Sequence, residues 1–291
     1  MIKLEHTEVV GWEAAIRGMR NPMNSWDKSD STFSKHICSN TVCWTDISLN
    51  ELPPCNIPEE VHVDNWTGLF YNVGPNDLEL MMKLRNAGTD HRKFMRMITV
   101  YVDITAPLYW WKEFKTYRAG RRFGDDEPDI IDDGYLECDI ETNSCSTMHK
   151  IHEKEFTLED FSCEHLSEPA ISILKNIIEA LNQARDLYLG YNGFKHKWGD
   201  WEKKHYWWQM IQLLPSSYNQ KRTVMLNYEV LANIYKSRRG HKLDCWREFC
   251  SWIETLPYSE LITGTSLKDI PICNEIMEEA KRRVTNEEDK K

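Results

Sequence analysis

The spacing of apolar residues predicts a mixed chain in which helices outnumber strands. Apolar residues that recur every three or four positions are typical of an amphipathic helix, and strict alternation is typical of a half-buried strand. Helices are predicted over residues 11–20, 75–86, 107–117, 170–190, 200–213 and 274–284. Strands are predicted over residues 2–8 and 98–104. This pattern favours an α+β fold with a sheet flanked by long helices.

Two stretches carry no periodic pattern. Residues 21–58 are rich in Ser, Thr, Asn, Asp and Pro, which indicates ordered loops and turns rather than core. Residues 125–141 hold a dense run of Asp and Glu, which is typical of a solvated loop. Because no long linker separates the periodic segments, we expect one domain over residues 1–291. It would carry an acidic insertion near residues 119–142 and a frayed, charged C-terminal tail.

The segment from Leu214 to Trp252 has the most unusual composition. Pro215 and the two serines after it mark a boundary before a helix, and no Gly or Pro interrupts residues 223–239. At a rotation of about 100° per residue, four positions of this predicted helix fall within about 60° of one another. They are Asn227, Leu231, Ile234 and Arg238, and Asn233 flanks the same side.

The periodicity of this stripe leaves two interpretations open. In the first, the helix belongs to the core, and its amide and guanidinium groups are paired internally. In the second, the helix lends these groups to a ligand with carbonyl and phosphate edges. Arg222 and Lys221 would lie at the start of the same helix, where the positive end of the helix dipole favours anions.

Composition and charge restrict the function. A chain of 291 residues with 41% hydrophobic residues can bury the core of a large domain. A net charge of −10 disfavours a nucleic-acid surface, since such domains usually carry a basic face, but it leaves room for a small anionic ligand. No apolar run approaches the length of a membrane span, and the first residues lack a signal-peptide core. We therefore expect a cytoplasmic protein.

The cysteines do not form a recognisable metal site. Nine cysteines without a C-x-x-C pair are expected to be mostly small buried hydrophobes. His36, Cys38, Cys43 and Cys55 come close together along the chain, but their spacing fits no zinc signature. The acidic block has no EF-hand spacing. No metal site is predicted.

The order Asn-x5-Asn-x4-Arg after an L-P-x-x-Y start resembles the C-terminal signature of the flavin-dependent thymidylate synthases. The matching residues are Asn227, Asn233 and Arg238. The resemblance implies that the two asparagines contact FAD and that Arg238 contacts the nucleotide phosphate. The family usually has a further Arg two residues after the first Asn, where this chain has Glu229.

Other family motifs are matched in part. Asp90-His91 is similar to an acid–His step that places its His against FAD. Lys112-Glu113-Phe114 stands where the family has Arg-His-Arg, so Lys112 alone is implied as a cofactor contact. Residues 143–149 match N-E-x-S-x-R-Y at Asn143 and Ser146 only. The resemblance implies that Ser146 and Arg238 are the catalytic and substrate-binding residues, with Arg222 as a further phosphate contact.

The resemblance implies FAD-dependent transfer of a one-carbon unit to C5 of a uracil nucleotide, as in the conversion of dUMP to dTMP. The flavin would carry both hydride and carbon, with methylenetetrahydrofolate and NADPH as co-substrates. The protein would supply orientation and electrostatics. The family also implies a mostly antiparallel central sheet and a homotetramer with FAD sites between subunits. Twelve Trp and twelve Tyr are compatible with a large interface.

Other functions stay open. The same flavin chemistry could yield another C5-modified pyrimidine, such as a hydroxymethyl product. The missing hallmark cations favour a non-catalytic protein that kept the fold and binds a nucleotide or flavin. Finally, Leu52-Pro53-Pro54-Cys55 resembles the nucleophile turn of the flavin-free thymidylate synthases, although Asn56 stands where that family has His.

Overall fold

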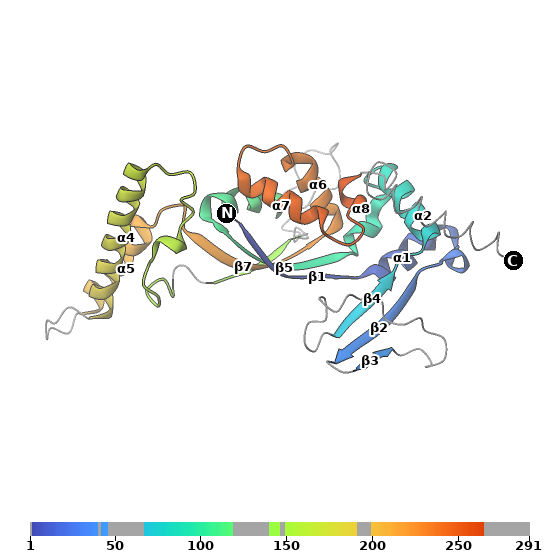
Figure 1. Cartoon of the computed structure of the whole chain (residues 1–291), viewed down its shortest axis with the longest axis horizontal. Helices are drawn as coiled ribbons and strands as arrows, with labels where there is room; N and C mark the ends of the chain where they lie inside the picture. The colour runs from blue at the N-terminus through green and yellow to red at the C-terminus, as the bar shows by residue number, and fades with distance from the viewer. Residues whose placement is uncertain are drawn as a thin grey trace, which may run out of the picture. The chain divides into compact units, whose positions relative to one another are not determined.

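A computed structural model describes residues 2–39, 42–45, 67–118, 140–145, 149–190 and 199–264 of the chain (Figure 1). The chain divides into two compact units. Unit 1 comprises Met1–Val9 and Val100–Ser259, and unit 2 comprises Val10–Thr99 and Glu260–Lys291.

Unit 1 is built on a four-stranded antiparallel sheet with the strand order β1-β5-β7-β6. The strands are β1 (Lys3–Val10), β5 (Thr99–Pro107), β6 (Glu141–Ser144) and β7 (Asn219–Asn227). In the ladder between β6 and β7, Glu141 pairs with Met225 and Ser144 pairs with Arg222. The predicted α+β class, with a central antiparallel sheet flanked by helices, is confirmed.

One face of this sheet is buried under aromatic side chains. Alternate residues of β5 and β7, such as Ile104 and Val224, have no exposed surface. Trp110 packs against Trp246 and Phe249, with ring centroids 4.9 and 5.6 Å away. The helices that carry or flank these residues are α3 (Leu108–Phe114), η5 (Lys115–Arg118), α6 (Tyr228–Arg238) and α7 (Asp244–Glu254). Burial of this much aromatic surface is a main source of stability for unit 1.

The opposite face of the sheet is polar. Lys221 on β7 lies 3.1 Å from the carboxylate of Asp103 on β5, and Thr223 donates a hydrogen bond of 2.6 Å to the same carboxylate. These cross-strand contacts fix the register of β5 against β7, because a slip of one residue would turn the charged groups into the core.

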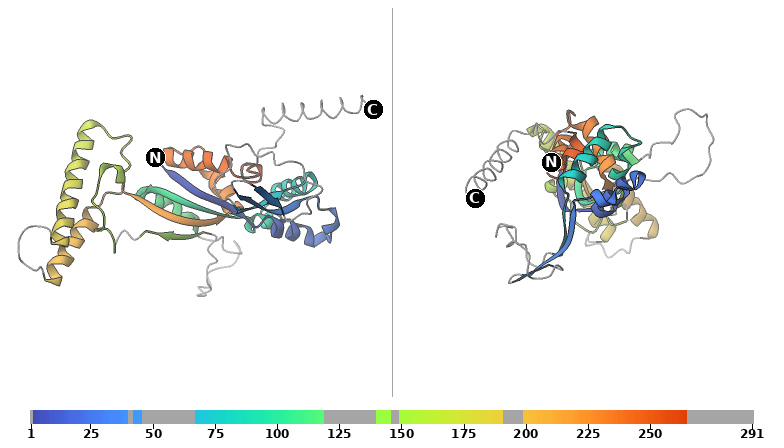
Figure 2. Two further views of the ribbon diagram at one scale, coloured as in Figure 1. Left: turned by 60° about the horizontal axis from the view of Figure 1, so that its bottom comes forward. Right: turned by 90° about the vertical axis from the view of Figure 1, so that its right-hand side faces the viewer.

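Two long helices form a second hydrophobic cluster of unit 1. They are α4 (Glu168–Leu189) and α5 (Asp200–Leu213), which lie side by side (Figure 1, Figure 2). Leu174, Leu181 and Met210 are buried between them. Gly190 ends α4 in the left-handed conformation, with a φ of 80°, as its position predicts. Ile173 is 61% exposed, because the buried stripe of α4 lies one position further along the helix.

Unit 2 combines short helices with a three-stranded antiparallel sheet of order β3-β2-β4. The strands are β2 (Thr32–Ser39), β3 (Val42–Thr45) and β4 (Thr67–Asn72). The helices are α1 (Trp12–Arg20), η1 (Asn21–Met23), η2 (Trp26–Lys28), α2 (Pro75–Asn86), η4 (Arg92–Arg96) and α8 (Glu260–Thr263). The prediction of loops over residues 21–58 is wrong at β2 and β3. Ladder hydrogen bonds to neighbouring strands hold this polar segment extended, and composition does not reveal such partners.

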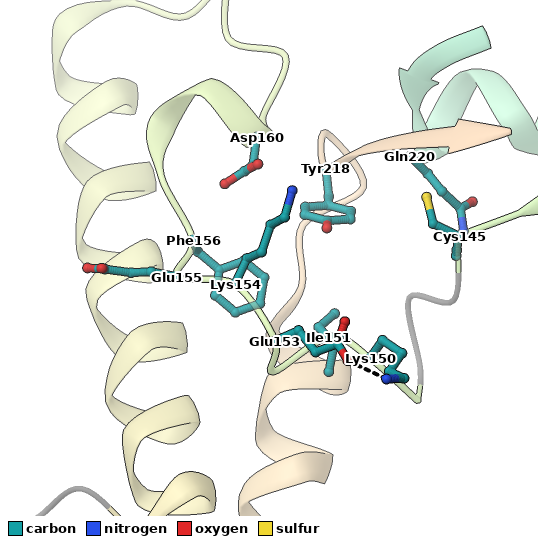
Figure 3. A pocket seen from close by; sticks show the side chains of 10 residues that line it. All are labelled: Cys145, Lys150, Ile151, Glu153, Lys154, Glu155, Phe156, Asp160, Tyr218 and Gln220. Atoms are coloured by element: carbon teal, nitrogen blue, oxygen red, sulfur yellow. Dashed lines mark hydrogen bonds and ion pairs between the residues drawn. The ribbon is translucent and has the colours of Figure 1, made fainter. Parts of the chain in front are cut away.

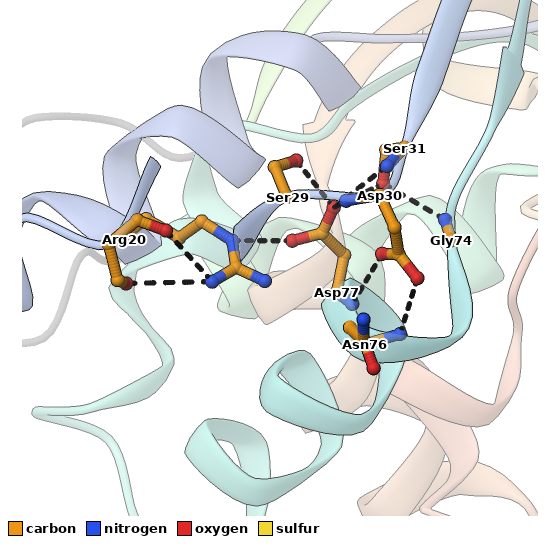
Figure 4. Close-up of polar contacts among 8 residues, drawn as sticks. Arg20, Ser29, Asp30, Ser31, Gly74, Asn76 and Asp77 are labelled. Atoms are coloured by element: carbon orange, nitrogen blue, oxygen red, sulfur yellow. Dashed lines mark hydrogen bonds and ion pairs between the residues drawn. The ribbon is translucent and has the colours of Figure 1, made fainter. Parts of the chain in front are cut away.

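A buried ion pair ties α1 to the start of α2 in unit 2 (Figure 4). Arg20 Nε donates to Asp77 Oδ1 at 2.6 Å, and the two side chains are 5% and 0% exposed. Asp77 Oδ2 accepts from Ser29 Oγ at 2.7 Å and from the Ser31 N–H at 3.1 Å. Burial alone would raise the pKa of Asp77, but hydrogen bonds from Ser31, Ser29 and Arg20 outweigh it and lower that pKa. The carboxylate is therefore fully satisfied where it is buried.

Asp30 holds the N-terminus of α2 in the same network (Figure 4). Its carboxylate accepts the backbone N–H groups of Asn76 and Asp77 at 2.9 and 3.1 Å. A carboxylate at this end of a helix satisfies donors that have no partner within the helix and complements the helix dipole. Gly74 is required beside it, because a Cβ there would lie 2.2 Å from Asp30 Cγ.

The predicted helix over residues 223–239 is correct only in its second half. Strand β7 runs to Asn227, and α6 begins at Tyr228. Lys221 and Arg222 therefore lie on a strand and not at a helix N-terminus, which corrects their predicted setting. Sheet partners distant in sequence override the local helical spacing. The period of two is visible in the buried residues of β7, which include Gln220, Arg222, Val224 and Leu226.

The other elements agree with the predicted ones. The predicted helices at 11–20, 75–86, 170–190 and 200–213 correspond to α1, α2, α4 and α5, and the strands at 2–8 and 98–104 correspond to β1 and β5. The helix predicted over 107–117 is α3 followed by η5. Thr157 and Asp160 form a capping box at η6 (Leu158–Asp160).

Some predictions fall outside the described residues. These are most of the acidic insertion near 119–142, the helix over 274–284, the C-terminal tail and the Leu52–Cys55 turn. The assignment of residues 1–291 to one domain stays a prediction. Within the part of the chain that the structure describes, no helix is long and apolar enough to cross a membrane.

Candidate functional site

A cavity of about 280 Å³ lies in unit 1 beside the end of β6 (Figure 3). A cavity of this size is close to the lower end of the range for small-molecule sites, about 300 Å³. It opens between the start of β7 and the segment that precedes η6. Its lining residues are Cys145, Lys150, Ile151, Glu153, Lys154, Glu155, Phe156, Asp160, Tyr218 and Gln220.

The wall of this cavity carries both charges and a phenol. Lys150 forms an ion pair with Glu153, and the side chain of Lys154 extends towards Tyr218 and Asp160 (Figure 3). Burial raises the pKa of the Tyr218 phenol, and the negative charge of Asp160 adds to the effect. The phenol thus stays protonated at neutral pH and is available as a hydrogen-bond donor. The lining also holds three carboxylates, on Glu153, Glu155 and Asp160, so the two ammonium groups and the phenol stand in a cavity of mixed charge.

The wall nearest β6 is formed by Cys145 and Gln220. The Cys145 N–H and Sγ both donate to the Lys221 carbonyl, at 3.2 and 3.0 Å. Gln220 Nε2 donates to the Cys145 carbonyl at 2.9 Å. Ser146 follows Cys145 directly in sequence but lies outside the described residues, as do Thr147 and Met148. Its predicted substrate contact stays a prediction.

Helix α6 places the three residues of the C-terminal signature in different surroundings. Asn227 is 7% exposed and caps the helix, because its Oδ1 accepts the Val230 N–H at 3.0 Å. Asn233 is exposed on the second turn. Arg238 is half-buried in the last turn. Asn227 therefore caps α6, a role that the helical spacing did not predict. Its contact with FAD stays a prediction.

Arg238 is held by a cluster of acidic and aromatic side chains in unit 1. Its Nε donates to the Tyr117 hydroxyl at 2.7 Å, and its Nη1 lies 3.2 Å from Glu113 Oε2. The guanidinium also lies over the Trp246 ring, 4.8 Å from the centroid. Trp246 Nε1 donates to the same Glu113 oxygen at 2.8 Å. Cation–π and ion-pair contacts together fix the position of this guanidinium.

The three residues of α3 that the resemblance aligns with Arg-His-Arg differ in their exposure and in their contacts. Lys112 is exposed, Glu113 pairs with Arg238, and Phe114 is fully buried in the aromatic core. Lys112 is therefore the one member of this triplet whose charge faces solvent. Its predicted cofactor contact stays a prediction.

Arg222, predicted as a phosphate contact, is buried on β7. It is 8% exposed, its guanidinium lies over the Trp111 ring at 4.2 Å, and its Nε and Nη2 both donate to Gln220 Oε1 at 3.0 and 2.7 Å. This arrangement corrects its predicted place in a solvated turn at a helix N-terminus. The guanidinium is directed into the sheet's buried face by the alternation of β7.

His91 belongs to unit 2, whereas the cavity and α6 belong to unit 1. It is exposed and precedes η4 as its N-cap residue, without a side-chain capping bond. Its predicted contact with FAD is untested. Among the residues that the structure describes, no cluster of His, Cys, Asp and Glu has the arrangement of a metal site.

Sequence reasoning missed Gln220, Tyr117 and Trp246 as partners of the candidate residues. Gln220 and Arg222 are separated by two positions, which places both on one face of a strand. This signal was present but was outweighed by the helical spacing further along. Tyr117 and Trp246 carry no comparable signal, because their contacts with Arg238 join segments far apart in the sequence.

Unit 1 also has a second cavity, of about 250 Å³, between Glu164 and His165, which follow η6, and the start of α7. It holds none of the predicted site residues, and its lining includes Tyr109, His165, Asp244 and Cys245. Burial, together with a hydrogen bond to Cys245, raises the pKa of Tyr109 to about 12. The first cavity, which is lined by Cys145 of the sequence motif over residues 143–146, is therefore the candidate site.

No protein-family model matches the chain, and no curated protein sequence matches it. Solved structures do. The chain is similar to thymidylate synthase X (ThyX) from Helicobacter pylori with FAD and dUMP, with a TM-score of 0.50 and 13% sequence identity over 94% of this chain and 99% of that one. The fold is that of ThyX. A second structure, flavin-dependent ThyX from Helicobacter pylori complexed with FAD and dUMP, has a TM-score of 0.49 and 13% identity, covering 90% of this chain and 98% of that one.

Proposed function

We propose that the protein is a ThyX-like, FAD-dependent enzyme that transfers a one-carbon unit to C5 of a uracil nucleotide. The observation that carries the proposal is the cavity beside Cys145 in a chain with the ThyX fold. The solved ThyX structure of that fold holds FAD and dUMP. Cys145 lines the cavity, and it lies within a sequence motif that matches the family's substrate motif at Asn143 and Ser146.

The described residues fit a nucleotide in this cavity. Lys154 supplies a cationic donor for a phosphate, and the Tyr218 hydroxyl supplies a neutral donor for a ring carbonyl. Lys150 would exchange its partner Glu153 for the phosphate. Ser146 and Arg238 are proposed as substrate contacts from the family motif. Arg222 is better explained as a structural residue because its guanidinium is buried.

The residues proposed for FAD are Asn233, Asn227, Lys112 and His91. Asn233 fits this role in one respect, because it is exposed on α6. Lys112 is an exposed cation suited to a pyrophosphate. When bound, FAD would supply the hydride and one-carbon transfer, with methylenetetrahydrofolate and NADPH as co-substrates. The chain's own side chains would bind and orient the two ligands.

A second candidate function is binding of a nucleotide or flavin without catalysis. The pairing of Glu113 with Arg238 favours it, since the guanidinium assigned to the phosphate is already satisfied by a carboxylate. A product other than thymidylate, such as a hydroxymethyl pyrimidine, is the further alternative within the same flavin chemistry.

An absorption spectrum with and without added FAD tests the proposal first. We expect flavin bands in the purified protein or their appearance after FAD is added and excess is removed. Mass spectrometry of the product formed from dUMP, methylenetetrahydrofolate and NADPH then separates the candidates. Thymidylate supports the proposal, a hydroxymethyl product supports the alternative chemistry, and a flavin-bound protein that leaves dUMP unchanged supports the binding role.

Arg238→Ala tests the role of this residue. We expect the Kd for dUMP to rise at least tenfold while the Kd for FAD changes little, because a guanidinium is a strong bidentate partner of phosphate. Isothermal titration with each ligand measures both. An equal loss of both ligands would contradict the assignment, and Arg247→Ala, at an exposed surface ion pair, is the control.

A further inference from the structure

We propose that Gln220 and Arg222 are positioning residues that fix the backbone of Cys145 and thereby set the wall of the cavity that Cys145 and Gln220 form. The inference rests on the proposed function only in taking this cavity as the nucleotide site. The contacts themselves belong to unit 1 and join α3, β7 and the end of β6.

The orientation of the Gln220 side-chain amide is determined by its neighbours. Its oxygen accepts from Arg222 Nε and Nη2 at 3.0 and 2.7 Å, and a guanidinium can only donate. Its Nε2 donates to the Cys145 carbonyl at 2.9 Å, and a carbonyl can only accept. If the amide were flipped, its NH2 group would face the Arg222 donors and its oxygen would face the Cys145 carbonyl oxygen. The amide is thus locked in one orientation.

Arg222 is itself locked by Trp111. The guanidinium lies over the indole ring at 4.2 Å, and Trp111 Nε1 donates to the Gln220 carbonyl at 3.0 Å. Trp111, Gln220 and Arg222 therefore form a closed cycle of contacts. With exposed fractions of 1%, 5% and 8%, the three residues form this cycle away from water, where each hydrogen bond is hard to replace.

The cycle acts on the backbone of Cys145 at the point where the β6–β7 ladder ends. Ser144 opposite Arg222 is the last ladder pair. Beyond it, the Cys145 N–H is bonded to the Lys221 carbonyl and the Cys145 carbonyl is bonded to Gln220. Both backbone polar groups of Cys145 are thus held by adjacent residues of β7, so the position of Cys145 in the cavity wall is fixed. Cys145 and Gln220 both line the cavity.

Gln220→Glu separates this positioning role from folding. The introduced carboxylate has the same shape and still accepts the Arg222 fork, but when ionised it cannot donate to the Cys145 carbonyl. We expect amide hydrogen exchange at Cys145 to become at least tenfold faster and the KM for dUMP to rise about tenfold. Flavin affinity should stay near the wild-type value, and the thermal midpoint should fall only modestly, because one acceptor loses its donor while the Arg222 contact is kept.

The pH profile of this variant gives a signature that a merely structural role does not produce. When the introduced carboxyl is protonated, it regains an O–H donor for the Cys145 carbonyl. Exchange at Cys145 and the KM should therefore return towards wild type as the pH falls through the pKa of the introduced group. Because amide exchange slows with falling pH in any protein, exchange is compared as the ratio of the variant to the wild type at the same pH, and this ratio should fall towards one.

Two further variants complete the test. Arg222→Lys keeps a cation but loses the two-pronged contact and the flat stacking on Trp111, so exchange at Cys145 should accelerate in it as well. Gln212→Glu places the same new charge on an exposed position of α5 and should change neither measurement.

Wild-type exchange at Cys145 in both Gln220→Glu and Arg222→Lys would overturn the proposal. If Gln220→Glu does not fold, Arg222→Lys decides by the same exchange measurement. If exchange accelerates but the wild-type protein binds no uracil nucleotide, the positioning role stands and the proposed function fails.

Discussion

Glu113 and Arg238 form the contact that bears most directly on ligand binding at the scale of single residues. The carboxylate lies 3.2 Å from Arg238 Nη1 and also accepts from Trp246 Nε1 at 2.8 Å. A carboxylate in contact with a guanidinium competes with a phosphate for the same donors. Glu113, which the resemblance aligns with the middle of Arg-His-Arg, is thus an anion that partly neutralises the predicted phosphate contact.

Glu113→Gln removes this competition while it keeps the shape of the side chain. We expect dUMP to bind about three- to tenfold more tightly, because the amide still accepts from Trp246 but no longer neutralises Arg238. Titration calorimetry of the wild type and the variant measures the change. Glu254→Gln, which alters a carboxylate bonded to Tyr235, is the matched control. An unchanged dUMP affinity in Glu113→Gln would show that Arg238 does not bind the phosphate.

The Arg20–Asp77 pair is the second decisive contact at this scale, and it serves stability. Both groups are buried, so removal of one charge leaves the other uncompensated. We expect Asp77→Asn to lower the free energy of unfolding by about 3–5 kcal/mol. Urea unfolding at neutral pH measures this loss. Asp186→Asn, which removes a surface partner of Arg185, should have little effect.

The same carboxyl gives a pH dependence with a defined sign. Its pKa in the folded protein lies below the ordinary value of 3.8, so its contribution is present above that pH and is lost as the pH falls through the folded pKa. The wild type should lose stability on acidification below about pH 4, and Asp77→Asn should lose less over the same range. Urea unfolding at pH 5 and pH 3 measures the loss of unfolding free energy in each protein. An equal loss in the wild type and in Asp77→Asn would contradict this prediction.

At the scale of elements, the junction between β7 and α6 determines which side chains are presented. A strand ends and a helix begins at Asn227, whose side chain caps the helix. Residues before this point alternate between faces, and residues after it follow the helical period. The signature therefore spans two kinds of structure, and its two asparagines have different exposure.

Substitution of Asn227 separates the cap from any contact with flavin. Asn227→Ala should cost about 1 kcal/mol of stability, whereas Asn227→Ser keeps an oxygen acceptor and should cost much less. If Asn227 also contacts FAD, Asn227→Ser should weaken FAD binding with a nearly unchanged thermal midpoint. Thermal unfolding and FAD titration of both variants distinguish the two uses. If Asn227→Ser binds FAD with the wild-type affinity, Asn227 caps the helix and does not contact FAD.

At the scale of the whole molecule, the described chain forms two compact units, each with its own sheet. The candidate cavity, the Arg238 cluster and the Gln220–Arg222 cycle all lie in unit 1, and the Arg20–Asp77 network lies in unit 2. Large aromatic side chains are exposed on α5 of unit 1, with Trp201 at 76% and Trp208 at 45%. Exposed tryptophans are typical of surfaces that bind other molecules.

We propose a homotetramer, which is the assembly that the family resemblance implies. Light scattering coupled to size-exclusion chromatography should give a mass about four times that of the chain, with and without FAD. A monomer at micromolar concentration would contradict this and would favour a non-catalytic role, because the resemblance implies flavin sites between subunits.

The sequence determined those features that depend on local spacing. Helical periodicity located α2, α4 and α5, Gly190 marked the end of α4, and the motif beginning at Asn143 pointed to the neighbourhood of the cavity. These features depend on residues within a few turns of one another, so neighbouring residues in the sequence are enough to predict them.

Only the tertiary structure decided what the candidate side chains contact. Arg222 became a buried residue because β5 and β6 hold β7 extended, and Arg238 became an ion-paired residue because α3 packs beside α6 with Glu113 facing it. These outcomes depend on pairings between segments separated by about a hundred residues. Local spacing cannot encode them, because the same stretch of chain adopts either period according to the partners that the fold brings to it.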